Sequence, residues 1–321
     1  MTGVRRALPW LALLLLLALP AFAGKFYVEL FARIMIMAVF ALSLDLLVGV
    51  TGLVSLGHAA FFGLASYVVV LAAPDQYTAT SLWTSLPLAV GASALLALAI
   101  GALALRARGV YFIMVTLAFS QLVYFVFHDT KLGGGSDGTY LYVKPQAKLG
   151  SFAALDLSDA TQFYYTMLLL LAASFGFLRL LLASRFGRAL AGIRSNEQRM
   201  RALGFNTYVY KLAAFTLAGA LAGLAGYFAA VQFGFVNPEM LSWHQSANVL
   251  LMVILGGAGN LFGAIVGAFA FILLEDAFSL LTKHWLLLMG GFVIGAVMLL
   301  PGGLTRVGEH WRAWRLRAGN A

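Results

Sequence analysis

The stretch YVELFARIMIMAVFALSLDLLV, residues 27–48, decides the fold class. It is a continuous apolar run in which the charged side chains are Glu29, Arg33 and Asp45. A helix that crosses a bilayer needs about 20 mainly apolar residues, whereas a membrane β-strand would show strict alternation of apolar and polar residues. We therefore interpret residues 27–48 as a transmembrane helix.

The same pattern recurs along the whole chain. Of its 321 residues, 62% are hydrophobic and 10% are charged, against about 25% charged residues in soluble proteins. This composition excludes a soluble enzyme and predicts an all-α polytopic membrane protein with about 8–10 transmembrane helices. The other candidate spans are residues 8–23, 53–73, 82–105, 109–127, 163–183, 211–234, 247–278 and 285–300.

A glycine-rich stretch interrupts the apolar tract 247–278. It reads Gly256-Gly257-Ala258-Gly259-Asn260, and glycines weaken a continuous helix. Counted as one span, the tract gives nine crossings and separates the two basic termini, which the positive-inside rule places together in the cytoplasm. We therefore predict a helix break or a re-entrant segment near 256–260, with both termini cytoplasmic.

With this break, the positive charges are distributed unequally between the two sides of the membrane. Fifteen of the 21 Lys and Arg residues fall on the predicted cytoplasmic side, including those of the basic tail 302–321, and five fall outside, while Arg33 lies within a span. The longest outer loop covers residues 129–162. The basic balance therefore indicates topology and contact with anionic lipid, not nucleic-acid binding.

The first segment has a second interpretation. Arg5 and Arg6, the apolar run and Ala21-Phe22-Ala23 also fit a cleaved secretory signal peptide. Cleavage would invert the next segment and reverse the charge sorting, so we favour retention of residues 1–23.

The predicted cytoplasmic loop 184–210 has one apolar face and one basic face. Ser195 followed by Gln198 fits a capping box, and Gly204 fits a helix stop. We predict two short helices parallel to the membrane with a break near Ser195, which either rest on lipid headgroups or act as a lever moved by a soluble partner. The apolar residues at helical spacing are Phe186, Leu190, Ile193, Met200 and Leu203.

The sequence contains no pattern that supports catalysis or a resident cofactor. There is no phosphate-binding G-x-x-x-x-G-K-[ST] loop, and the five histidines show no metal-ligand spacing. The chain has no cysteine, which excludes disulfides and thiolate metal sites. We predict a non-catalytic protein without metal or cofactor.

Polar residues within the spans are candidate functional residues, because an ionisable group at the bilayer centre costs about 2.5–3.5 kcal/mol. Asp45 makes an interhelical hydrogen bond, has a role in a transport path or coupling, or lies at the membrane interface. Arg33 lies twelve residues away, about 18 Å along one helix, so the two can pair only loosely within it. The candidates for lining or gating a path are Asp45, Ser55, His58, Phe61, Thr116 and Gln121.

Four ordered blocks together resemble a known family. They are LVSLGHAAFFGLASY (53–67), GVYFIMVTLAF (109–119), parts of 187–212, and LMVILGGAGN (251–260) continued by Gly263 and Gly267. These blocks are similar to those of branched-chain amino acid ABC transporter permeases, and the chain length suits the LivM type.

The resemblance implies a single permease domain over residues 1–321 in a bacterial inner membrane. Its implied partners are a second homologous permease subunit, two cytoplasmic ATP-binding subunits and a periplasmic solute-binding protein. Segment 185–204 would then couple the chain to the ATPases. The residues implied in this contact are Arg188, Ile193, Arg194, Glu197, Arg201, Leu203 and Gly204.

Two departures from the family pattern leave the substrate open. The family usually has Asn at Asp45 and Thr-Gly-Gly at Gly133-Gly134-Gly135, and related permeases carry urea or short amides. An alternative of another class is a stand-alone secondary transporter that uses Asp45 as an ion site. It predicts uptake without ATPase partners.

Overall fold

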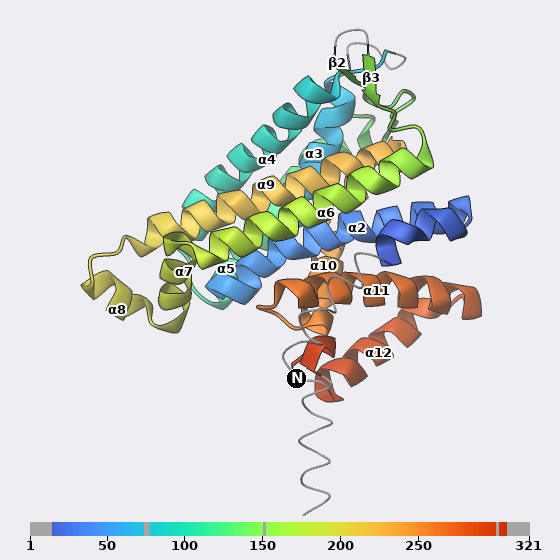
Figure 1. Cartoon of the computed structure of the whole chain (residues 1–321). Helices are drawn as coiled ribbons and strands as arrows, with labels where there is room; N and C mark the ends of the chain where they lie inside the picture. Colours follow the sequence, from blue (N-terminus) through green and yellow to red (C-terminus); the bar gives the residue numbers. More distant parts are fainter. Residues whose placement is uncertain (1–14, 74–77, 150–151, 300–301, 307–321) are drawn as a thin grey trace, which may run out of the picture.

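The computed structural model describes residues 15–73, 78–149, 152–299 and 302–306, and helices dominate this part of the chain (Figure 1). Six helices in it are long and apolar enough to cross a membrane. The first, Lys25–Thr51, consists of α2 (Lys25–Asp45) and the π-helical turn η1 (Leu46–Thr51). The other five are α4 (Leu82–Ala104), α5 (Val110–Asp129), α6 (Ala160–Ala183), α9 (Thr207–Phe233) and α11 (Leu261–Leu281).

Two shorter apolar helices, α3 (Ala59–Leu71) and α12 (Trp285–Leu299), complete this set. The prediction of an all-α polytopic membrane protein is confirmed. Residues 15–22 of the predicted span 8–23 are helical, and residues 8–14 lie outside the described residues. The terminal arginines Arg5, Arg6, Arg312, Arg315 and Arg317 also lie outside them.

The centre of the bundle is formed by α2 and α9. In their most apolar windows 83% and 78% of the residues are buried inside the protein, against 28% for the other four spans. Small residues bring the helices close, because a Cβ at Gly226 would overlap the backbone of Phe62, and one at Gly223 would overlap Ser93. These two helices therefore form the buried core of the bundle.

The predicted span 53–73 is wrong in its first part, because residues 52–58 are irregular and α3 begins only at Ala59. Gly52 has a φ of 75° and ends η1. Irregular backbone inside a membrane protein needs internal hydrogen-bond partners, and Ser246 Oγ accepts a hydrogen bond from Ala59 N at 2.8 Å. An apolar sequence window does not reveal such a partner.

The predicted break in the tract 247–278 is confirmed. Helix α10 (Trp243–Gly256) ends where the glycines begin, and α11 starts at Leu261. Gly257 and Gly259 have φ angles of 103° and 86°, which side chains other than glycine rarely adopt. With 14 residues, α10 is about 21 Å long and too short to cross the membrane alone. The 3-10 turn η3 (Pro238–Leu241) precedes it.

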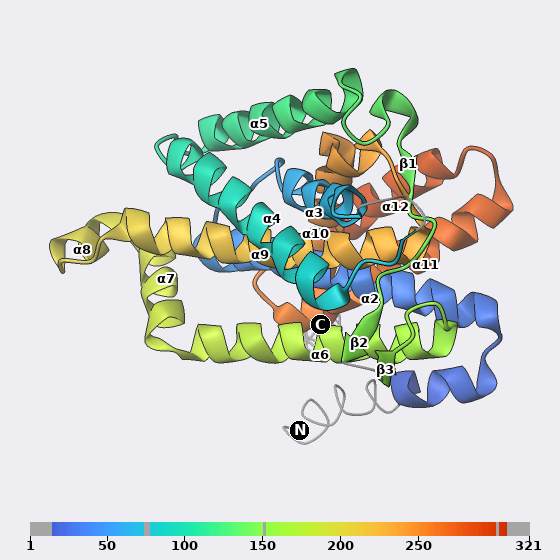
Figure 2. The same cartoon turned by 90° about the horizontal axis from the view of Figure 1, so that it is seen from above.

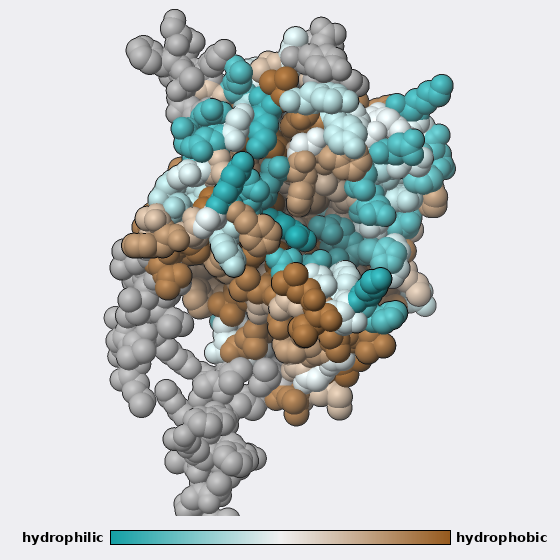
Figure 3. Space-filling view, turned by 90° about the vertical axis from the view of Figure 1, so that its right-hand side faces the viewer, coloured by the Kyte–Doolittle hydropathy of each residue, from teal (hydrophilic) through white to brown (hydrophobic). Residues whose placement is uncertain are grey.

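The two longest polar loops lie at opposite ends of the bundle (Figures 1 and 2). At one end lie α7 (Arg185–Ser195) and α8 (Glu197–Ala202). At the other lie η2 (Gly135–Asp137) and short strands that the sequence did not suggest. Figure 3 shows the molecule from this second end, with hydrophilic side chains gathered over the upper part of the surface. The strands are β1 (Thr139–Tyr140), which pairs antiparallel with β4 (Phe235–Val236), and β2 (Ala147–Leu149), which pairs antiparallel with β3 (Phe152–Leu155).

Candidate functional site

The helix pair α7–α8 is built as two separate helices. Ser184 Oγ accepts a hydrogen bond from Phe186 N at 3.2 Å and starts α7. Asn196 Oδ1 accepts one from Arg199 N at 2.9 Å and starts α8. The predicted capping box of Ser195 and Gln198 is therefore wrong, because the cap is the next residue along the chain.

The apolar face of the pair is only partly buried. Leu190 and Ile193 are buried, whereas Leu203 is 66% exposed. Gly204 follows α8 with a φ of 85°, as expected of a helix stop. The exposed basic residues Arg188 and Arg199 lie on the same pair. The pair therefore presents basic and apolar side chains to its surroundings.

Glu197 fixes α8 to the start of α9. Its carboxylate accepts hydrogen bonds from Arg201 at 2.5 Å, from Lys211 at 2.6 Å and from Thr207 at 3.0 Å. Burial of the carboxylate raises the pKa of Glu197, but the hydrogen bonds from Lys211, Thr207 and Arg201 and the charge of Lys211 outweigh burial and lower the pKa to about 2. Glu197 therefore remains ionised and keeps the two helices together.

Arg194 connects α7 to the end of the central helix. Its guanidinium donates a hydrogen bond to the carbonyl oxygen of Gly49 in η1. In the same place Asp45 Oδ1 accepts a hydrogen bond from Gly259 N at 2.7 Å. A Cβ at Gly49 would collide with both Asp45 and Gly259. Helix α7, the turn η1 and the glycine turn 256–260 thus meet at one point.

A further segment holds the glycine turn in place. Thr305, in the short turn η4 (Leu304–Arg306), donates a hydrogen bond from Oγ1 to Gly256 O at 3.0 Å. Asn260 Nδ2 donates one to Thr305 Oγ1 at 3.3 Å, and a Cβ at Gly257 would approach the backbone of Gly302. The residues predicted to break the helix therefore form an ordered turn.

His58 lies buried between helices. It is fully buried, stacks on Phe40 and is 2.9 Å from Ser43 Oγ through Nε2. The Ser43 hydroxyl donates to Phe40 O at 2.6 Å, so Nε2 of His58 acts as the donor to Ser43. This arrangement is that of a helix–helix contact.

The other path candidates lie in different surroundings. Ser55 accepts a hydrogen bond from Gly57 N, Phe61 packs edge-on against Phe215, and Thr116 donates to Ile113 O. All three are fully buried. Gln121 lines a cavity that lies between helices.

Sequence reasoning missed some residues of this site. No local motif marks Gly49 or Thr305, although Gly49 is the single glycine within residues 25–51. The sequence relates Arg33 to Asp45, whereas the structure places Arg33 3.7 Å from Glu275 of α11. A lone glycine in a long apolar run was the signal that could have pointed to Gly49.

Known proteins share sequence with this chain over most of its length. Residues 26–301 match the family described as "Branched-chain amino acid transport system / permease component". The chain is 32% identical over 321 residues to the high-affinity branched-chain amino acid transport system permease protein LivM of Salmonella typhimurium, and equally to LivM of Escherichia coli, covering 94% of this chain and 75% of each relative.

A more distant relative covers only part of the chain. The autoinducer 2 import system permease protein LsrC of Photorhabdus laumondii is 30% identical over 176 residues, which is 53% of this chain and 52% of that protein. No solved structure matches the chain. From the match over residues 26–301 and the likeness to LivM, the chain belongs to the family of branched-chain amino acid transport system permease components.

Proposed function

We propose that this chain is the membrane-spanning subunit of an ATP-driven importer for branched-chain or related amino acids, and that it forms half of the translocation path. The helix pair α7–α8 would couple it to ATPase subunits. The observation that carries this proposal is the convergence of Arg194, Gly49, Asp45 and Gly259 between the pair and the bundle.

The contacts of the pair define how a movement would travel. A partner that binds α7 and α8 moves two helices, each tied to a different part of the bundle. Glu197 ties α8 to α9 through Lys211, and Arg194 ties α7 to the end of α2 through Gly49. Because α2 and α9 are the most buried spans, a displacement of the pair reaches the centre of the protein.

The proposed partners follow from the relatives, which are named as parts of transport systems. They are a second homologous permease subunit, two cytoplasmic ATP-binding subunits and a periplasmic solute-binding protein. ATP hydrolysis belongs to the partners, since the sequence has no phosphate-binding loop. In the bacterial inner membrane both termini would face the cytoplasm, where anionic lipid contacts the basic tail.

A substitution on the exposed face of the pair tests the proposal. Arg199→Glu combined with Leu203→Asp changes two exposed side chains that make no hydrogen bond or ion pair with the described residues, so the fold of the bundle should persist. We expect the ATP-binding subunits to be lost from the purified complex and amino acid uptake by vesicles to fall at least tenfold. The measurement is co-purification in mild detergent together with uptake.

Arg108→Glu is the matched control, because Arg108 is an exposed arginine on the same predicted side but outside the pair. It should keep both the ATP-binding subunits and uptake. If the double variant retained both as well, the coupling role of residues 185–204 would be wrong. If the unaltered chain transported amino acids without any ATP-binding subunit, the importer proposal itself would fail.

A further inference from the structure

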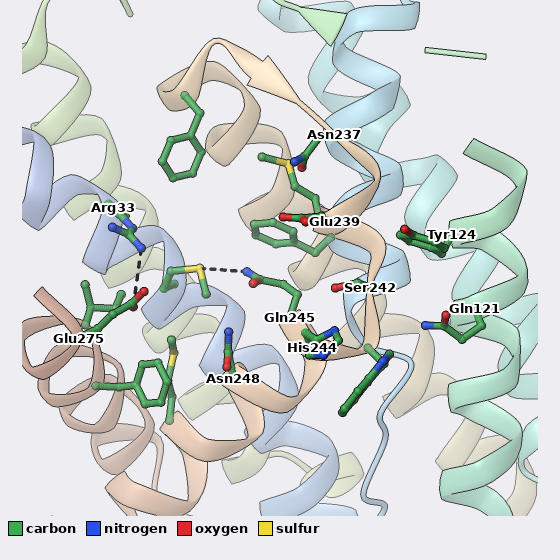
Figure 4. A pocket seen from close by; sticks show the side chains of 18 residues that line it. Arg33, Gln121, Tyr124, Asn237, Glu239, Ser242, His244, Gln245, Asn248 and Glu275 are labelled. Carbon is green, nitrogen blue, oxygen red and sulfur yellow. Dashed lines mark hydrogen bonds and ion pairs between the residues drawn. The ribbon is translucent and has the colours of Figure 1, made fainter. Parts of the chain in front are cut away.

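A cavity of about 580 Å³ opens between α2, α5, α10 and α11 and the segment that contains η3 (Figure 4). This volume lies within the range of pockets that hold small molecules, about 300–1,000 Å³. The cavity is lined by charged, amide and apolar side chains. It is distinct from the contact of Arg194 with Gly49, since it lies near Arg33, about 18 Å along α2 from Asp45.

The cavity presents opposite charges a short distance apart. Arg33 of α2 and Glu275 of α11 face each other with an N–O separation of 3.7 Å (Figure 4). This is longer than a hydrogen bond, so both groups keep capacity for other partners. Their side chains are 36% and 25% exposed, and Glu239 adds a second carboxylate to the lining. Both charges are therefore only partly buried by this chain.

Gln121 adds an unused hydrogen-bond donor. It lies on α5, and Figure 4 shows its amide nitrogen pointing toward the other labelled residues of the lining. This Nε2 atom is buried and has no hydrogen-bond partner among the described residues. A buried amide without a partner is unfavourable, because it has lost its hydrogen bonds to water. A polar ligand in the cavity would satisfy it.

The apolar part of the lining lies beside these charges. Phe62, Met252, Phe271 and Ile272 are all buried and all line the cavity. A ligand that satisfies this lining carries one negative group, one positive group and an aliphatic part. An α-amino acid zwitterion with an apolar side chain has these three features.

We infer that the Arg33–Glu275 cavity binds a zwitterionic, apolar α-amino acid on its way through the membrane, with Arg33 bound to the carboxylate and Glu275 to the ammonium group. The inference rests on the proposed function for the direction of transport. A second cavity also contains Arg33 but lacks Glu275, and it is lined instead by Glu29, Lys144 and Asp276. Of these two cavities, the first has Glu275 in its lining together with the buried apolar residues named above, and the second does not.

The absence of cysteine from the chain allows a direct test. Asn248→Cys places the single thiol of this chain in the cavity lining, and Ser279→Cys places it in the second cavity as the matched control. The rate of modification by a small charged thiol reagent is measured in vesicles that contain the assembled transporter. We expect L-leucine to slow modification of Asn248→Cys at least threefold and to leave Ser279→Cys unchanged.

Two analogues test which charges are recognised. Leucinamide lacks the carboxylate and 4-methylpentanoate lacks the ammonium group, so each should protect Asn248→Cys at least threefold less than leucine does. Adding Arg33→Gln to Asn248→Cys should abolish protection by leucine. Absence of protection, equal protection by all three compounds, or protection of Ser279→Cys alone would overturn the inference.

The result is separable from the proposed function. If the ATP-binding subunits co-purify and ATP drives uptake while leucine fails to protect Asn248→Cys, the cavity assignment is wrong and the importer proposal stands. If the ATP-binding subunits are absent while leucine protects Asn248→Cys and Arg33→Gln abolishes that protection, the cavity assignment stands and the importer proposal fails.

Discussion

At the scale of single residues, Asp45 illustrates how a charged side chain is accommodated in an apolar helix. It is 1% exposed and its Oδ1 atom accepts a hydrogen bond from the backbone of Gly259. Gly49 leaves room for this contact, because any Cβ there would collide with Asp45. The sequence marked Asp45 as unusual, but its partner lies 214 residues away and is not predictable from local pattern.

Substitutions of Asp45 distinguish an ATP-driven importer from a secondary transporter. Asp45→Asn keeps an acceptor oxygen for Gly259 N, so we expect uptake to stay within about twofold of the unaltered protein. Asp45→Leu leaves the amide of Gly259 without its partner, which destabilises by about 1–3 kcal/mol and should lower both uptake and melting temperature. Uptake is measured at fixed ATP with and without a proton uncoupler. Loss of uptake in Asp45→Asn, with sensitivity to the uncoupler in the unaltered chain, would instead support a secondary transporter.

At the scale of elements, the helix pair α7–α8 was the most predictable part of the site. Apolar residues at helical spacing, with basic residues on the opposite face, indicated two helices, and Gly204 indicated where the second one ends. The position of the cap differed by one residue, because Asn196 and Ser195 are both good capping residues and only the backbone conformation selects between them. The attachment of α8 to α9 through Glu197 was not predictable, since it needs the fold of residues 205–211.

The attachment of α8 should depend on pH. The pKa of Glu197 is lowered from its ordinary 4.5 to about 2, so its contribution to stability is present above about pH 4.5 and is lost as the pH falls from 4.5 toward 2. Glu197→Gln should lower the melting temperature at pH 7, and the difference from the unaltered protein should shrink over that pH window.

Thr207→Val serves as the comparison, because it removes one of the hydrogen bonds to Glu197 and leaves Lys211 and Arg201 in place. It should give a smaller decrease of the melting temperature at pH 7. A difference between Glu197→Gln and the unaltered protein that stays constant from pH 7 to pH 3 would contradict the ionised role of Glu197.

At the scale of the whole molecule, the two ends of the bundle carry different structures. The helix pair lies at one end, and the loop with β1 and the paired strands β2 and β3 lies at the other (Figures 1 and 2). The charge sorting in the sequence predicts that the first end faces the cytoplasm. The short α10 and the glycine turn 256–260 allow the chain to turn back inside the bundle without a full crossing.

Single cysteines test this orientation. Ser136→Cys in the predicted outer loop should react with a membrane-impermeant thiol reagent in spheroplasts. Arg199→Cys on α8 should react only after the membrane is permeabilised, because the bilayer separates it from the reagent. The measurement is the labelled fraction of each variant. The reverse pattern would show that the chain is inserted with the opposite topology.

The sequence by itself determined the class of fold, the approximate spans, the break at 256–260 and the amphipathic helix pair. These properties depend on hydropathy and glycine content within short windows, and such windows carry that information directly. The same windows gave a wrong prediction at residues 52–58. An apolar segment is predicted as a helix even where its backbone groups form their hydrogen bonds outside a helix. The tertiary structure alone decided which side chains meet. Arg194 with Gly49, Asp45 with Gly259 and Arg33 with Glu275 are long-range contacts, and such contacts arise from packing between helices that no local pattern encodes.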